Sequence, residues 1–244
     1  MTVNLPAPGR KMTELWTFVA VDPLAAPLSR RLARVGFVTP NRLTAVALAL
    51  GVGAAICFAT GRLRIGGALF VLRFFVDCLD GRVARLQGTS SARGASFDLG
   101  VDVLGVTASY AALGWWLVDA GHLEPGWAVA LLGAVGLYNW ELEHRKHLAA
   151  SADLGTGGAT HRWQPRWFPV RQWVGFCERK GISVVPWAVE CEIATLGLAP
   201  LLLPASALGW SVWTALAFYV VADLLNAFRI RRITSLLDHP GDSA

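Results

Sequence analysis

The chain has 244 residues, of which 54% are hydrophobic and 16% are charged, and its formal net charge at pH 7 is +5. Its mean hydropathy is +0.46, whereas soluble domains carry about 25% charged residues, so the composition argues against an ordinary soluble domain. Its four cysteines form neither a CxxC pair nor a zinc-binding spacing. A membrane protein is therefore the first interpretation.

The N-terminal part of the chain divides in two. Residues 1–13 are polar and expected to be disordered, and residues 14–38 are too interrupted to cross a membrane. Within the second part, Leu28, Leu32 and Val35 recur at helical spacing, with three arginines between them. That pattern is typical of an amphipathic juxtamembrane helix on an anionic membrane surface; a plain surface helix is the alternative.

Residues 39–232 contain the apolar segments and are interpreted as one membrane-embedded domain, followed by a short polar tail at 233–244. A transmembrane helix needs about 20 mostly apolar residues, and six segments approach that length. They are residues 41–60, 66–85, 98–120, 126–142, 184–204 and 208–230. The predicted fold class is therefore an all-α integral membrane protein with six transmembrane helices, preceded by the amphipathic helix.

Basic residues are distributed unevenly among the loops. The loops after the first, third and fifth segments hold only Arg62 and Arg64, while the other side holds six basic residues in 1–42 and seven in 143–182. Cytoplasmic loops are enriched in Lys and Arg. We therefore expect a multi-pass protein of the cell (inner, cytoplasmic) membrane, with both termini and the segment 77–102 on the cytoplasmic side.

Four aspartates lie where the second apolar segment ends and the third begins: Asp77, Asp80, Asp98 and Asp102. A charged side chain inside a bilayer costs about 2.5–3.5 kcal/mol on insertion scales, so four of them require neutralisation. On helices, spacings of three and four residues put each pair on one face. Two helices joined by a short turn can then direct all four carboxylates, ligands typical of Mg²⁺ or Mn²⁺, at one point.

The complete pattern D-x2-D-G-x2-A-R-x8-G-x3-D-x3-D occupies residues 77–102. By this motif the chain resembles the CDP-alcohol phosphotransferases, membrane enzymes of phospholipid biosynthesis. The resemblance implies metal-dependent transfer of a substituted phosphoryl group from a CDP-alcohol, such as CDP-diacylglycerol, to an alcohol hydroxyl, with release of CMP. It implies that Asp77, Asp80 and Asp98 are metal ligands, and that Asp102 is the general base and a further ligand of a two-metal site.

Other residues of the motif suit a nucleotide and its phosphates. Gly81 and Ala84 lie one helical turn apart, so a nucleotide could approach the backbone there. Arg85 can contact phosphate oxygens through two nitrogens, and Gly94 permits backbone conformations that larger residues resist.

Asn41 and Thr44, in the segment Pro40-Asn41-x-Leu43-Thr44, match a weaker upstream element of the family, where the nucleotide is approached. Helix capping explains their positions equally well. Arg73 lies four residues before Asp77 and is predicted to pair with it along the helix, in preference to a substrate role.

The acceptor candidates are Trp187 and Glu190, which share a face at the start of the fifth segment. An aromatic ring beside a carboxylate suits an amine or quaternary ammonium group. The alternative is structural, because an acidic residue favours a helix N-terminus and Trp favours the membrane interface.

The expected partners are a CDP-alcohol donor, an alcohol acceptor and the lipid bilayer, with no nucleic acid. The resemblance also implies a homodimer, and a stripe of small residues on the third segment offers a packing face: Gly105, Ala108, Ala111 and Gly114. Head-group transfer from a soluble CDP-alcohol to a lipid alcohol stays open. A cation transporter that uses intramembrane aspartates is an alternative of another class, for which acids spread over several segments would be expected.

Overall fold

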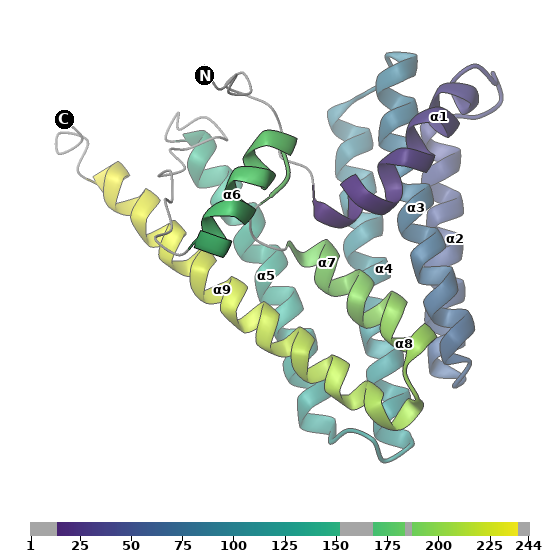
Figure 1. Ribbon diagram of the computed structural model, residues 1–244, viewed down its shortest axis with the longest axis vertical. Helices are drawn as coiled ribbons and strands as arrows, with labels where there is room; N and C mark the ends of the chain where they lie inside the picture. The colour runs from purple at the N-terminus through teal and green to yellow at the C-terminus, as the bar shows by residue number, and fades with distance from the viewer. Residues whose placement is uncertain (1–13, 152–167, 184–186, 239–244) are drawn as a thin grey trace.

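The computed structural model describes residues 14–151, 168–183 and 187–238, which are mainly helical and contain no β-strand (Figure 1). The helices are α1 (Asp22–Leu32), α2 (Pro40–Ala59), α3 (Leu63–Gln87), α4 (Ala92–Asp119), α5 (Pro125–Ser151), α6 (Phe168–Lys180), α7 (Ala188–Glu192), α8 (Ala199–Leu202) and α9 (Leu208–Asp238). The all-α class is confirmed for this part of the chain. Residues 1–13, expected to be disordered, lie outside it, as do residues 239–244 of the tail.

The N-terminal segment packs against α3. A π-helical turn, Thr17–Val21, runs directly into α1. Pro23 therefore lies inside a continuous helical segment, where it omits one hydrogen-bond donor. Val21 and Ala25 are buried and form a small apolar cluster with Leu79 of α3. This face of α1 is therefore part of the protein core.

Polar contacts also attach the N-terminal segment to the end of α3. Arg82 donates to the carboxylate of Asp22. Gln87 Nε2 donates to the carbonyl oxygens of Ala33, at 3.3 Å, and Val38, at 3.0 Å. The contact of this segment with a membrane surface remains a prediction.

Local capping sets the ends of α2, α3 and α4. The Thr39 hydroxyl accepts from the backbone N–H of Arg42 at the start of α2, and Ser91 does the same for Gly94 at the start of α4. Gly88 ends α3 with φ +67°, a conformation that favours glycine. The turn between α3 and α4 is consequently shorter than expected.

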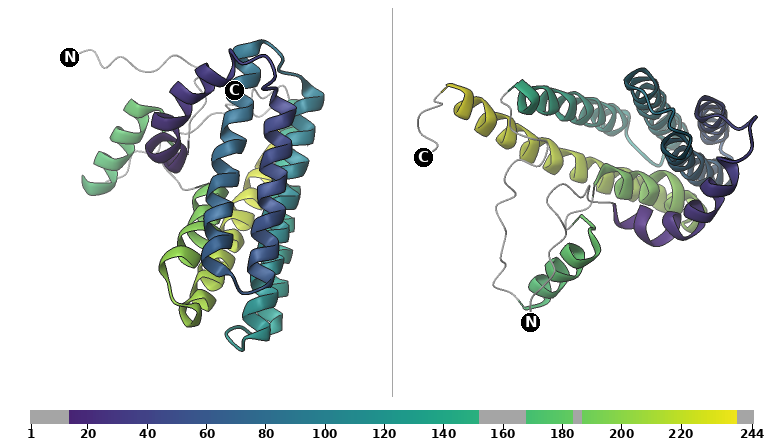
Figure 2. Two further views of the ribbon diagram at one scale, coloured as in Figure 1. Left: turned by 90° about the vertical axis from the view of Figure 1, so that its right-hand side faces the viewer. Right: turned by 90° about the horizontal axis from the view of Figure 1, so that it is seen from above.

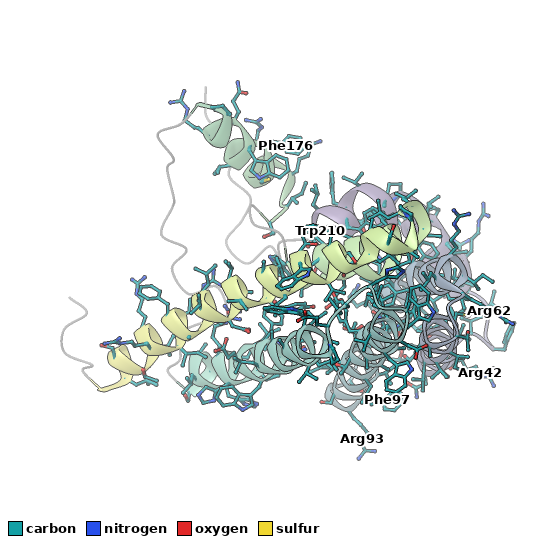
Figure 3. All side chains as sticks on the ribbon, turned by 90° about the horizontal axis from the view of Figure 1, so that it is seen from below. Arg42, Arg62, Arg93, Phe97, Phe176 and Trp210 are labelled. Carbon is teal, nitrogen blue, oxygen red and sulfur yellow. The ribbon has the colours of Figure 1, made fainter. Side chains whose placement is uncertain are left out.

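Helix α2 packs against both α3 and α4, and the three run side by side (Figure 2). Because α4 begins at Ala92, before the expected position 98, Asp98 lies inside the helix. At the outer side of this end of α4, Arg93 and Phe97 project away from the other helices (Figure 3). The two halves of the aspartate motif therefore meet at one end of the bundle.

Helices α5 and α9 pack along each other, with the ring centroids of Trp127 and Trp213 3.8 Å apart. Between them in sequence, α7, a π-helical turn (Ile193–Leu198) and α8 form one continuous helical segment of fifteen residues. This fifth segment crosses α3 closely, since a Cβ on Gly67 would lie 2.7 Å from the carbonyl oxygen of Gly197. Helix α6 stands apart from the long helices (Figure 2).

Three helices in the described part of the chain are long and apolar enough to cross a membrane: Pro40–Ala59, Arg93–Asp119 and Ala205–Ser235. Helices also occupy the other three predicted positions, but α3 carries the charges of the motif and the fifth segment is short. The count of six transmembrane helices and their orientation therefore remain predictions.

The small-residue stripe of α4 is used within the chain. A Cβ on Gly114 would lie 3.2 Å from Ala128 Cβ of α5, and a Cβ on Gly105 would lie 2.9 Å from Arg73 Nε of α3. Both glycines are buried, whereas Ala108 is exposed and Ala111 is half-buried, so two of the four positions pack within the chain. The homodimer remains a prediction that rests on the resemblance.

Candidate metal and phosphate site

Three aspartates converge where α3 ends and α4 begins. Asp77, Asp80 and Asp98 each contribute a carboxylate oxygen, and these oxygens all lie within 4.8 Å of one another. Asp80 is 3% exposed, and the hydroxyl of Thr44 on α2 donates to its Oδ2 at 2.6 Å. Three helices therefore build this cluster, which we call the three-aspartate cluster.

Two members of the three-aspartate cluster, Asp77 and Asp98, each have a carboxylate oxygen without a protein donor in the described part of the chain. Asp77 Oδ1 and Asp98 Oδ1 are buried, and no hydrogen-bond partner for either exists among the described residues. An unpaired buried carboxylate oxygen is unfavourable, and three carboxylates close together repel one another. Hard oxygen ligands with unmet charge fit a divalent cation such as Mg²⁺ or Mn²⁺.

Asp102, the fourth aspartate, has a different environment. Arg73 Nη2 donates to Asp102 Oδ1 and, at 3.2 Å, to the Asp102 carbonyl oxygen. The predicted pairing of Arg73 with Asp77 along α3 is therefore wrong about the partner, because the side chain of Arg73 reaches across to α4. The Asp102 side chain is 42% exposed, so its carboxylate is also open to a ligand.

The residues predicted to contact the nucleotide lie next to the three-aspartate cluster. A Cβ on Gly81 would lie 3.5 Å from Arg85 Nη1, an ordinary contact, so Gly81 and the exposed Arg85 share one face of α3. Ala84 is half-buried on the same turn. Gly94 already has a structural use, since its N–H donates to Ser91 Oγ.

Asn41 and Thr44, which were predicted to act together near the nucleotide, lie in different environments. Thr39 caps α2, so the capping interpretation of these two residues is wrong. Thr44 is buried and contacts Asp80, whereas Asn41 is exposed at the helix start. Thr44 therefore supports the three-aspartate cluster.

The acceptor candidates Trp187 and Glu190 lie together, but their hydrogen bonds cap the start of the fifth segment. Glu190 Oε2 accepts from the backbone N–H of Trp187 at 2.8 Å, and Glu190 Oε1 accepts from that of Trp16 at 3.4 Å. The Trp187 indole N–H donates to Ser183 Oγ at 2.7 Å. These contacts favour the structural alternative for both residues, and their acceptor role remains a prediction.

Sequence reasoning missed a polar group deeper in the fifth segment. The Tyr219 hydroxyl of α9 donates to Glu192 Oε1 at 3.1 Å, and the hydroxyls of Tyr110 and Thr195 lie 2.7 Å apart. The charges that act on Glu192 include Asp102 and Arg73, so it lies toward the motif. The signal for Glu192 was present, since an acid inside an apolar segment is a functional candidate.

The fold and the site together define a helical membrane protein in which a carboxylate cluster fits a divalent cation beside an exposed arginine suited to phosphate. Residues 37–153 match the family model described as CDP-alcohol phosphatidyltransferase. The resemblance drawn from the motif is thereby confirmed.

Curated relatives match parts of the chain. The phosphatidylinositol phosphate synthase of Corynebacterium glutamicum is 42% identical over 82 residues, covering 33% of this chain and 37% of the relative. That of Mycolicibacterium smegmatis is 39% identical over 121 residues, covering 48% and 53%. The chain thus aligns with about half or less of the length of these relatives.

Solved structures share the fold. The Mycobacterium tuberculosis phosphatidylinositol phosphate synthase with CDP-DAG bound has a TM-score of 0.55 at 20% identity, covering 85% of this chain and 94% of that one. Its apo form has a TM-score of 0.53 at 21% identity, covering 84% and 94%. At these identities the likeness concerns the fold alone.

Proposed function

We propose that the chain transfers a phosphatidyl group from CDP-diacylglycerol to the hydroxyl of an alcohol and releases CMP. The observation that carries this proposal is the three-aspartate cluster, with two buried oxygens that lack protein donors, in a chain that matches this family model. The choice of donor is supported by the M. tuberculosis enzyme, whose structure holds CDP-DAG.

Each residue has a proposed role. Asp77, Asp80 and Asp98 would hold Mg²⁺ or Mn²⁺, which would supply positive charge to neutralise a pyrophosphate and stabilise the attacking and leaving oxygens. Arg85 binds phosphate oxygens. Asp102 accepts the proton of the acceptor hydroxyl, whose oxygen forms the new bond to phosphorus while the bond to CMP breaks.

Other residues would admit and orient the donor. Gly81 and Ala84 leave room for the nucleotide, and Asn41, exposed at the start of α2, is proposed to contact it. Gly94 shapes the start of α4 beside the phosphates. Thr44 orients Asp80 through its hydroxyl.

Two acceptor classes are supported by different observations. The names of the relatives favour a phosphorylated polyol. Arg145, which donates to Asn226 Oδ1 of α9 at 3.1 Å, and Arg229, three residues further along α9, would supply positive charge for its phosphate. Glu192, whose carboxylate lies toward Asp102, instead favours a neutral or cationic alcohol, because it would repel a phosphate.

The deciding experiment is CMP release by the purified protein in lipid, with CDP-diacylglycerol and Mg²⁺ or Mn²⁺. The acceptors compared are inositol phosphate, glycerol phosphate, inositol, serine and an amino alcohol, with lipid products identified by mass. We expect metal-dependent CMP release with at least one acceptor. Release only from soluble CDP-alcohols would favour head-group transfer, and cation flux into liposomes without CMP release would favour a transporter.

Two wider predictions accompany this function. We propose that the site faces the cytoplasm. Cysteines introduced beside Arg93 should then react with a membrane-impermeant reagent in inverted vesicles, whose cytoplasmic face is outside. We also propose a homodimer, which native mass measurement in lipid would test.

A further inference from the structure

Arg73 is the bulkiest side chain that is completely buried in the described part of the chain, at 1% exposure. Burying a guanidinium is costly unless it is paired and hydrogen-bonded. Its Nε has no hydrogen-bond partner among the described residues. Within the described part of the chain, the hydrogen bonds of Nη2 both go to one residue, Asp102.

Three helices shape the space around Arg73. A Cβ on Gly51 of α2 would lie 3.1 Å from Arg73 Cδ, and a Cβ on Gly105 of α4 would lie 2.9 Å from Arg73 Nε. The guanidinium carbon lies 5.6 Å from the centre of the Phe70 ring, a cation–π distance. Glycines on both flanking helices are thus needed to admit this arginine at its observed position.

The paired Asp102 lies outside the three-aspartate cluster. Asp98 and Asp102 are one turn apart on α4, a spacing that would let both reach one cation. Only Asp98 of the two belongs to the three-aspartate cluster, while Asp102 is paired with Arg73. An ion-paired carboxylate is also a weaker attractor for a second cation.

We propose that Arg73 is a positioning residue that holds the Asp102 carboxylate away from the metal ligands and keeps it directed at the acceptor hydroxyl. This rests on the proposed role of Asp102 as base. The cation then has three carboxylate-bearing residues, and the fourth stays available for proton transfer. Arg73 touches neither substrate nor cation in this arrangement.

The test measures Mn²⁺ binding to the full-length protein in lipid nanodiscs, without substrate, by titration calorimetry and electron paramagnetic resonance. Arg73→Gln removes a positive charge near the cation and frees Asp102, so we expect Mn²⁺ to bind about tenfold more tightly or with one further ion. The turnover number should fall while the KM for the CDP-donor stays the same. Arg82→Gln, which removes an arginine from the same helix, is the matched control and should leave Mn²⁺ binding unchanged.

The double variant Arg73→Gln/Asp102→Asn separates two causes. If Asp102 joins the metal ligands in Arg73→Gln, the double variant should bind Mn²⁺ no more tightly than Asp102→Asn alone. If the double variant still binds Mn²⁺ more tightly than Asp102→Asn, the gain reflects only the lost charge of Arg73, and the proposal is overturned. Unchanged Mn²⁺ binding in a folded Arg73→Gln protein also overturns it.

If Arg73→Gln does not fold, Gly105→Ala provides the test, because its added methyl group displaces the guanidinium. Tighter Mn²⁺ binding with lower turnover supports the proposal, and wild-type values of both overturn it. Absence of CMP release from the wild type would overturn the proposed function separately, since these binding comparisons need no substrate.

Discussion

Two groups of carboxylates, both in apolar surroundings, differ in the hydrogen-bond donors that the protein supplies to them. In the three-aspartate cluster, Asp77 and Asp98 each bury an oxygen without a protein donor. At the start of the fifth segment, Glu190 accepts two backbone N–H groups and Glu192 accepts a tyrosine hydroxyl. The comparison teaches that carboxylate oxygens without protein donors fit a cation where they gather within ligand distance of one another, whereas Glu190 and Glu192 use their protein donors to hold the fifth segment in place.

The largest loss of activity is expected from substituting a carboxylate that has an oxygen without a protein donor. Asp98→Asn keeps the size of the side chain and removes its charge, so CMP release should fall about a hundredfold to a thousandfold, the loss typical of removing one electrostatic stabiliser. Asp119→Asn, the same change at the exposed opposite end of α4, is the control. Near-normal turnover in Asp98→Asn would remove Asp98 from the proposed metal ligands.

A smaller effect is expected from the residue that supports the cluster. Thr44→Val removes the hydroxyl that donates to Asp80 and should lower activity or metal affinity about 10- to 100-fold, as for other groups that orient metal ligands. Thr60→Val is the matched control, because the Thr60 hydroxyl bonds only helix carbonyls at the far end of α2. Equal activities of the two variants would contradict this role.

Arg85→Lys should act on the donor. A lysine carries the charge but cannot make a planar two-nitrogen contact, so we expect the KM for CDP-diacylglycerol to rise about tenfold, which is a loss of about 1.4 kcal/mol in binding. The turnover number should change less. Arg93→Lys, at an exposed arginine (Figure 3), is the control, and wild-type kinetics for Arg85→Lys would exclude the phosphate contact.

The smallest effect is expected at the start of the fifth segment. Glu190→Ala removes a capping acceptor and should lower the free energy of unfolding by about 1 kcal/mol, measured by thermal melting, without changing acceptor preference. Glu192→Gln should instead change the KM for the acceptor. The reverse outcome would restore Trp187 and Glu190 as the acceptor candidates.

The sequence predicted what depends on local spacing and missed what depends on how helices meet. Helical spacing predicted that all four carboxylates of the motif reach one point, and three of them do: Asp77, Asp80 and Asp98. Asp102 is paired with Arg73 instead. The contact of Thr44 with Asp80 joins residues 36 positions apart, and spacing along one helix carries no information about it. Arg73 was assigned to Asp77 for the same reason, because its true partner is on another helix.

The start of the fifth segment was harder to predict for a different reason. The π-helical turn Ile193–Leu198 changes the angular progression of side chains relative to an α-helix. A regular helical pattern drawn through Trp187 and Glu190 therefore cannot give the orientation of the residues that follow. No sequence signal for this turn was found.

The short fifth segment has a consequence for the lipid around the protein. Fifteen helical residues span at most about 22 Å, against a hydrocarbon thickness of about 30 Å. If this segment crosses the membrane, the bilayer beside it must thin or the polar ends must sit below the headgroups. A water-soluble acceptor would then meet the phosphate of a lipid donor below the level of the surrounding headgroups, and bilayer thickness itself would tune turnover.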